Sequence, residues 1–269
     1  MALKDITLGQ YFPGNSPVHR LDPRTKLIAV VLYIVALFLA NWFITYAIML
    51  VVLAGSVTIS KVPPKSLLRG LKPILFIVVF TALLNLFYTP GNTILAHFWI
   101  FTVTLEGVYR AFFMVVRIMM LISGTFLLTY TTSPILLTDG LESLLGPLKK
   151  IKVPVHELAM MMSIALRFIP TLIEETDKIM SAQRARGADF ESGNLIQRAK
   201  ALLPLLVPLF ISAFRRADEL ATAMECRCYH GGEGRTRLRQ LKYKAADYVT
   251  LFLFLAVTVG VGILGYFGL

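Results

Sequence analysis

The stretch 246-ADYVTLFLFLAVTVGVGILGYF-267 decides the fold class, because nearly all of its residues are apolar. An α-helix needs about 20 consecutive apolar residues to cross the hydrocarbon core of a bilayer. Four further apolar runs precede this stretch, at about residues 27–41, 43–60, 71–88 and 107–130. The sequence therefore predicts an all-α integral membrane protein with about five transmembrane helices.

The charges of the chain orient these five runs. The 269 residues are 56% hydrophobic, with a mean hydropathy of +0.69, yet they carry a net charge of +11. Seventeen of the 27 Lys and Arg residues lie between positions 149 and 244, whereas the turn at Asn41 and the stretch 89–105 contain none. Because cytoplasmic segments collect Lys and Arg, this pattern predicts a cell-membrane protein with its N-terminus inside and its C-terminus outside. The same effect explains the basic charge, so we expect no nucleic-acid partner.

The basic block between the fourth and fifth runs has the sequence signals of amphipathic helices. Thr132-Ser133-Pro134 is a typical helix start, with a hydroxyl cap followed by proline at the first helical position. Pro154 interrupts the chain, and glycines at 187 and 231–232 are natural helix ends. The predicted organisation is a membrane domain at 1–131, a cytoplasmic domain at 132–245 with helices at about 134–150, 155–186 and 194–228, and a final transmembrane helix at 246–269.

Two of these predicted helices end in a tripeptide with a central arginine and small neighbours. The helix dipole favours a cation at a C-terminus, so a capping role is one interpretation. Arginine is also favoured at protein–protein interfaces, because its planar fork engages several acceptors at once. Small neighbours would let a partner's backbone approach closely. This second interpretation predicts two matching docking sites: Ala185-Arg186-Gly187 with Arg184 before it, and Cys226-Arg227-Cys228 with Glu225 before it.

The chain lacks the sequence patterns of a self-contained catalytic site. No glycine-rich phosphate loop with its lysine is present, so we expect neither a nucleotide site nor a cofactor. The only two cysteines, Cys226 and Cys228, indicate a reducing compartment and cannot complete a four-ligand site, so we expect no metal. His156-Glu157 begins like a zinc-protease motif, but Met160 stands where the second histidine would be. We therefore expect a protein that is not itself an enzyme.

Five motifs, taken in order, resemble one family: the transmembrane (T) component of energy-coupling factor transporters. The resemblance covers nearly the whole chain, and the ordered set is specific although any single tripeptide is not. The motifs are Leu21-Asp22-Pro23-Arg24-Thr25-Lys26, Thr132-Ser133-Pro134, Leu166-Arg167-Phe168-Ile169-Pro170, Ala182-Gln183-Arg184-Ala185-Arg186-Gly187 and Ala223-Met224-Glu225-Cys226-Arg227-Cys228.

The resemblance implies an energy-coupling subunit of an ATP-driven uptake transporter for vitamins and related micronutrients. Such a subunit joins two cytosolic ABC-type ATPase subunits to one small membrane subunit that binds the substrate. Its coupling helices end in Ala-Arg-Gly motifs that dock into grooves on the two ATPases. Residues 185–187 match this motif, whereas Cys226 and Cys228 replace the usual neighbours of Arg227. Prolines at 170, 204 and 208 are the expected places where the coupling helices flex.

Arg110 and Arg117 in the fourth apolar run are the intramembrane polar candidates. An ionised side chain is costly in a bilayer and usually faces protein or water. Arg117 is expected either to be a structural pin within the chain or to face the substrate subunit, and Arg110 to pair with Glu106 near the surface. These arginines also leave open a different class, a self-contained secondary transporter or a membrane-embedded enzyme.

Overall fold

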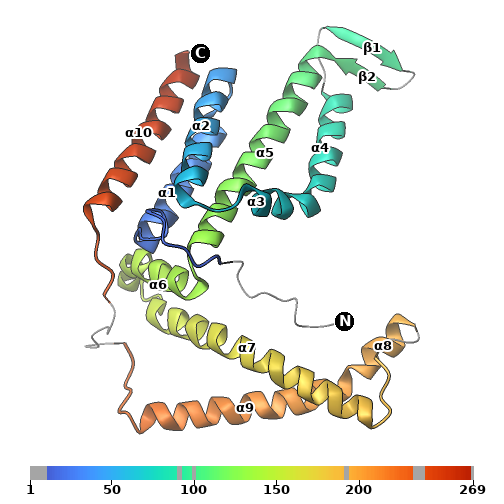
Figure 1. Cartoon of the computed structure of the whole chain (residues 1–269), viewed down its shortest axis with the longest axis vertical. Helices are drawn as coiled ribbons and strands as arrows, with labels where there is room; N and C mark the ends of the chain where they lie inside the picture. The colour runs from blue at the N-terminus through green and yellow to red at the C-terminus, as the bar shows by residue number, and fades with distance from the viewer. Residues whose placement is uncertain (1–10, 90–92, 99–100, 191–193, 233–239, 268–269) are drawn as a thin grey trace. The chain divides into compact units, whose positions relative to one another are not determined.

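The computed structural model describes residues 11–89, 93–98, 101–190, 194–232 and 240–267, and the chain divides into two compact units (Figure 1). We call residues 9–141 with 241–269 the membrane unit, and residues 142–240 the arm unit. The first unit holds most of the apolar runs, and the second holds most of the basic block.

Helices form most of the membrane unit, and side chains cap the starts of two of them. Asp22 caps the first helix by accepting a hydrogen bond from the backbone N–H of Arg24, and Thr104 caps the longest helix of this unit by accepting from Gly107. The elements are α1 (Pro23–Leu39), α2 (Phe43–Ser60), α3 (Pro64–Leu71), η2 (Lys72–Ile74), α4 (Leu75–Tyr88), β1 (Ile94–Phe98), β2 (Phe101–Thr104), α5 (Leu105–Thr131), the first part of α6 (Pro134–Leu144) and α10 (Ala245–Phe267).

Five helices in the described part of the chain are long and apolar enough to cross a membrane, which confirms the predicted fold class. They are α2, the continuous segment Pro64–Phe87, α5, Val155–Ala185 in the arm unit, and α10. This set differs from the predicted one at the first run, where α1 has 17 residues. Val155–Ala185 meets the criteria of length and composition because its first half is apolar, although we expect this helix to lie in the cytoplasm.

The core of the membrane unit gathers around α1, which packs against α10, α5 and α2. The side chains of Leu37 and Met49 are fully buried, and Tyr33 is 4% exposed. Gly124 of α5 lets the Tyr33 ring approach closely, since an added Cβ would lie 2.5 Å from Tyr33 Cε1. The Tyr33 hydroxyl then donates to the carbonyl of Met120 at 3.1 Å. A small residue on one helix and a large one on the other thus fix the α1–α5 contact.

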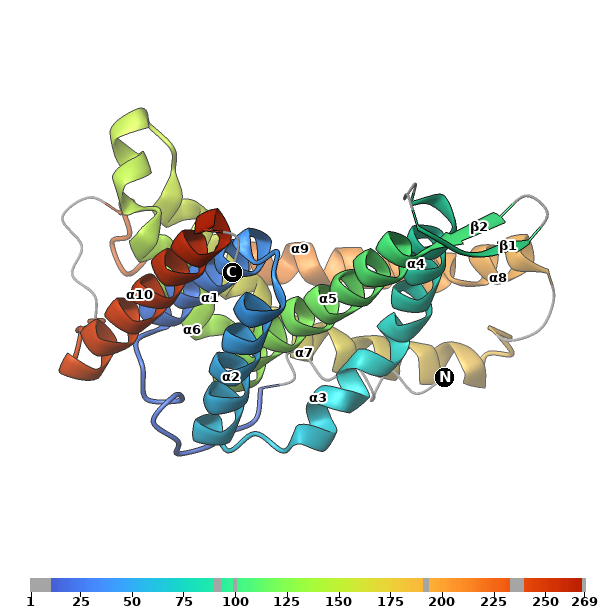
Figure 2. The same cartoon turned by 90° about the horizontal axis from the view of Figure 1, so that it is seen from above.

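A two-stranded antiparallel hairpin, β1–β2, occupies the segment that the sequence analysis treated as an outer loop. Its register pairs Ile94 with Thr104 and Phe98 with Phe101, with an irregularity near Ala96. Figure 2 shows it beyond the neighbouring ends of α4 and α5, as does Figure 1. The segment is rich in β-branched and aromatic residues, which favour strands over an irregular loop.

The arm unit consists of η3 (Gly146–Ile151), α7 (Val155–Ala185), α8 (Leu195–Ala201) and α9 (Leu203–Glu225), after the end of α6. The helix predicted at 194–228 is therefore divided at Leu202. Pro204 explains the division, because proline is suited to the first turn of a helix and disrupts an interior. Pro170 lies inside α7 and Pro208 inside α9.

The two long helices of this unit, α7 and α9, run in opposite directions and cross at an angle, close together toward the C-terminal end of α7 (Figure 1). Glu175 of α7 joins them, because its carboxylate accepts hydrogen bonds from the Ser212 hydroxyl and, at 2.7 Å, from Arg216 Nη2. These partly buried polar contacts fix the register of the two helices.

Candidate functional site

The first arginine tripeptide lies at the C-terminal end of α7, which closes through its own backbone. The N–H of Ala188 donates to the carbonyl of Gln183 at 3.0 Å, and the N–H of Gly187 donates to Arg184 at 3.0 Å. Gly187 adopts a φ of 88°, in the left-handed region. This pair of bonds around a left-handed residue is the Schellman motif of helix ends.

The second tripeptide, at the end of α9, repeats this geometry. The N–H of Tyr229 donates to the carbonyl of Met224 at 3.1 Å, and the N–H of Cys228 donates to Glu225 at 2.8 Å. Cys228 takes the left-handed position with a φ of 55°, which is unusual for a residue with a side chain. Arg186 and Arg227 therefore stand at equivalent positions, each one residue before the left-handed residue.

The side chains of both arginines are open to a partner. Arg186 and Arg227 are exposed, as are Ala185, Gly187, Cys226 and Cys228 around them and Arg184 and Glu225 before them. Within the described residues, neither central arginine makes a side-chain hydrogen bond or an ion pair. Backbone bonds close the last carbonyls, so a capping role for the guanidinium groups has no support in these contacts.

The two tips lie at opposite ends of the arm unit (Figure 1). With 31 residues, α7 is about 46 Å long at 1.5 Å per residue. Arg186 follows its C-terminal end, whereas Gly232, five residues beyond Arg227, packs against His156 in its first turn. The tips are therefore two separate sites of the same local shape.

The left-handed positions give the small residues of the tips a local role, in addition to the close approach of a partner. A residue with a Cβ pays about 1–2 kcal/mol in this conformation. We expect Gly187→Ala to loosen the end of α7, visible as faster amide hydrogen exchange at residues 183–188. Gly146→Ala is the matched control, because Gly146 also faces open space but has no positive φ. Equal exchange in both variants would contradict this explanation.

The same argument applies to the cysteines of the second tip. Cys228→Gly removes a side chain from a left-handed position, so we expect the end of α9 to keep or gain protection against exchange. The double change Cys226→Ala with Cys228→Gly should retain most transport. Complete loss of transport, restored by a metal or a redox agent, would show that the thiols themselves are required.

Arg117 of α5 pins the end of α1 to the start of α2. Its Nη2 donates to the carbonyl of Ala40 at 2.7 Å, and its Nε donates to the Tyr46 hydroxyl at 2.8 Å. The guanidinium also lies near the rings of Phe38 and Tyr46. These contacts favour the structural pin over a role facing the substrate subunit.

Arg110 is in a different situation. Its side chain is exposed, and Glu106, its expected partner, accepts a hydrogen bond from the Thr93 hydroxyl at 2.9 Å. The described residues include no Arg110–Glu106 ion pair.

Arg117→Ala should therefore lower stability, whereas Arg110→Ala should change it little. Hydrogen bonds from a charged donor contribute about 1.5–3 kcal/mol each, so a loss of a few kcal/mol is expected. The measurement is the thermal unfolding midpoint and folded yield of both variants in detergent. An Arg117→Ala protein with normal stability and no uptake would instead favour the interpretation that this residue faces the substrate subunit.

A buried charged cluster, which the sequence reasoning missed, joins the starts of α1 and α10. Asp247 is fully buried, and its carboxylate accepts the backbone N–H groups of Asp22 at 2.8 Å and Lys244 at 2.7 Å. The Lys26 ammonium donates to the carbonyl of Thr131 at 2.9 Å. The signal available in the sequence was the lone acidic residue at the start of the last apolar run, since such residues are rarely unpaired.

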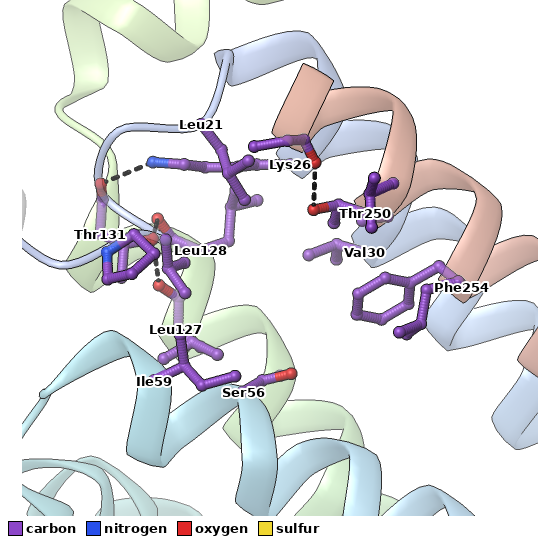
Figure 3. A pocket seen from close by; sticks show the side chains of 17 residues that line it. Leu21, Lys26, Val30, Ser56, Ile59, Leu127, Leu128, Thr131, Thr250 and Phe254 are labelled. Atoms are coloured by element: carbon purple, nitrogen blue, oxygen red, sulfur yellow. Dashed lines mark hydrogen bonds between the residues drawn. The ribbon is translucent and has the colours of Figure 1, made fainter. Parts of the chain in front are cut away.

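An apolar cavity of about 280 Å³ lies beside this cluster, between α1, α2, α5 and α10 (Figure 3). Val30, Leu127 and Phe254 line it, and Lys26 stands at its edge with the ammonium turned toward Thr131. The lining is almost wholly apolar, and its one cation is already hydrogen-bonded. We therefore assign no site for a polar substrate to this cavity.

Comparison with known proteins gives one consistent result. The sequence profile of the family CbiQ, described as "Cobalt transport protein", matches residues 14–238. Three similar curated proteins all carry the name "Energy-coupling factor transporter transmembrane protein EcfT". That of Acidaminococcus fermentans is 56% identical over 257 residues, 96% of each chain. That of Clostridium kluyveri is 58% identical over 248 residues, 92% of each chain. That of Bacillus subtilis is 54% identical over 245 residues, 91% of this chain and 92% of the relative.

Proposed function

The chain belongs to the CbiQ family as a transmembrane component of an energy-coupling factor transporter, and we propose that it transmits ATPase motion through its two arginine tips. The proposed partners are two cytosolic ABC-type ATPase subunits, one at each tip, and one small membrane subunit that binds a vitamin or related micronutrient. The chain itself takes no nucleotide and is a non-catalytic subunit of the transport complex.

The observation that carries this proposal is the repetition of one local shape at two distant helix ends. Each tip presents an exposed arginine at the residue before a left-handed position, and the bonds that close the helix involve backbone atoms alone. Stability of the chain does not require, at both places, a guanidinium that bonds to no other described residue. Two tips of one local shape would instead fit two matching sockets, one on each ATPase subunit.

The proposed mechanism is mechanical. ATP binding closes the ATPase pair and moves the two sockets, and α7 and α9 carry the displacement toward the membrane subunit that holds the substrate. The arm unit must favour different helix crossings in the open and closed ATPase states, since otherwise no work is transmitted. Pro170 and Pro208 each remove a hydrogen bond inside a helix, and Pro204 follows the break between α8 and α9, so all three supply places for flexing.

The proposed orientation places the N-terminus and the arm unit in the cytoplasm and the C-terminus outside. Single cysteines at Thr93 and Arg198, introduced into a cysteine-free background, test it with a membrane-impermeant thiol reagent on intact cells. We expect labelling at position 93 and protection at position 198, because the outer segments lack Lys and Arg. Labelling of both positions from the same side would contradict the orientation.

The test of the function is purification of the affinity-tagged chain from its native membrane, followed by mass spectrometry and reconstituted uptake. We expect ABC-type ATPases and a small membrane protein to co-purify, and uptake to require ATP. Uptake by the chain alone, driven by an ion gradient, would establish the secondary-transporter alternative instead.

A further inference from the structure

A histidine that the coupling function leaves unused lies at the start of α7. His156 is in the first turn of this helix, and its Nδ1 is 2.9 Å from Oε1 of Glu142 near the end of α6. The side chains of His156 and Glu142 are 20% and 9% exposed. This largely buried polar pair joins the end of α6 to the start of α7, on either side of the η3 segment.

The segment that follows the second arginine tip packs on the same histidine. A Cβ added at Gly232 would lie 2.5 Å from His156 Cδ2 and 2.9 Å from Cγ. Real Cβ contacts are not that short, so only glycine fits against the ring at this position. Gly231 before it has a φ of 99°, which turns the chain toward the ring. We call Glu142, His156 and Gly232 the clasp.

The hydrogen bonding of the clasp assigns the tautomer of His156. Its Nε2 is buried and has no hydrogen-bond partner within the described residues. A proton at Nε2 would be an unsatisfied buried donor, whereas a lone pair there costs less. The Nδ1–H group therefore donates to the Glu142 carboxylate. An asparagine at position 156 can place an amide N–H near the same point, which provides a conservative replacement.

The clasp makes the surroundings of the second tip different from those of the first. Only four residues lie between Arg227 and Gly232, so anchoring Gly232 limits where the second tip can lie. At the first tip, a Cβ added at Gly187 would meet open space within the described residues. The chain is thus anchored to the start of α7 at Gly232, soon after the second tip, whereas the first tip follows the far end of α7.

We propose that Glu142 and His156 are positioning residues for Arg227, which hold the second tip to α6 through the close contact at Gly232. This proposal rests on the docking function proposed above. A displacement of Arg227 would then pass through the clasp to α6, which follows α5 directly in the chain. It would not need to pass along the length of α7. The two ATPases would then act on the chain by two unequal routes.

A measurement on the purified full chain tests the clasp without any partner. Cys228→Gly leaves Cys226 as the single cysteine, beside Arg227, for a nitroxide spin label. We expect His156→Ala, Glu142→Ala and Gly232→Ala each to increase the mobility of this label, and His156→Asn to restore much of the order. A label on Ala185→Cys, with both native cysteines replaced, is the control and should not change. Unchanged mobility at Cys226, or an equal change at both labels, would overturn the clasp.

Measurements on the reconstituted transporter test whether the clasp affects the coupling of ATP hydrolysis to transport. His156→Ala and Gly232→Ala should retain both ATPases but hydrolyse several-fold more ATP per substrate moved, and His156→Asn should lower that ratio again. A normal ratio together with a mobile Cys226 label would overturn the positioning role while leaving the docking function intact. If the docking function itself is wrong, an Arg227→Glu chain will associate normally with the ATPases. This result distinguishes failure of the docking function from failure of the clasp.

Discussion

Reversing the charge of either tip, with Arg186→Glu or Arg227→Glu, is expected to give a membrane protein that inserts and folds but loses its ATPases and its uptake. Truncation of an interfacial hot-spot residue costs about 2 kcal/mol or more, which corresponds to roughly thirtyfold in the dissociation constant. Reversal should cost more, because it also places a carboxylate where the socket is built for a cation. The fold should be unaffected, since neither side chain bonds to another described residue.

The measurement is the amount of ATPase that co-purifies with each variant, alongside its folded yield. Arg215→Glu is the matched control, because Arg215 is an exposed arginine of α9 away from the tip. Arg227→Lys should be intermediate, since lysine keeps the charge but lacks the planar fork. Wild-type association and uptake in both tip reversals would remove the basis for the docking function.

Asp247→Ala is expected to have the largest effect on folding. The Asp247 carboxylate is fully buried and accepts two backbone N–H groups, a local one from Lys244 and one from Asp22, which lies 225 positions earlier in the chain. Removing it leaves the buried N–H of Asp22 unsatisfied, loses the cap at Lys244 and takes away an electrostatic partner of Lys26. Breaking a buried charged arrangement by removing one partner costs about 3–5 kcal/mol, a large fraction of a typical domain stability.

The check is the yield of monodisperse protein and its thermal unfolding midpoint. Asp247→Asn keeps an acceptor oxygen but loses the charge, so it should fall between the wild type and Asp247→Ala. Asp218→Ala, at an exposed position of α9, is the control for loss of an acidic side chain. A normal midpoint for Asp247→Ala would show that the cluster does not hold α1 to α10.

The sequence predicted the features that depend on local pattern. Apolar length alone was enough for the fold class and for helices such as α2 and α10, and proline with glycine marked the ends of α7. The helical pattern of the sequence continues through Leu202 and does not reveal the break there. Pro204 was the available signal, because proline suits the first turn of a new helix. The β1–β2 hairpin was not predicted. The absence of Lys and Arg in this segment indicates only its orientation, whereas its β-branched and aromatic residues favour strands.

The features that depend on long-range packing could not be predicted in the same way. Asp247 meets Asp22 only because α10 packs beside α1, and no spacing in the chain reveals that neighbour. His156 was considered as a metal ligand, whereas its observed partner is Glu142 on the preceding helix. At the tips, the sequence located the arginines, but only the backbone showed that Gly187 and Cys228 take left-handed conformations.

The most direct test of the central claim is photo-cross-linking from each tip within the assembled transporter. A benzophenone maleimide on Cys226 in the Cys228→Gly background probes the second tip, and one on Ala185→Cys in the cysteine-free background probes the first. Mass spectrometry then identifies the protein joined to each tip. The account predicts an ABC-type ATPase at both positions, with a pattern that changes when ATP is added. Cross-links from both tips to the substrate-binding membrane subunit or to lipid, with none to an ATPase, would contradict it.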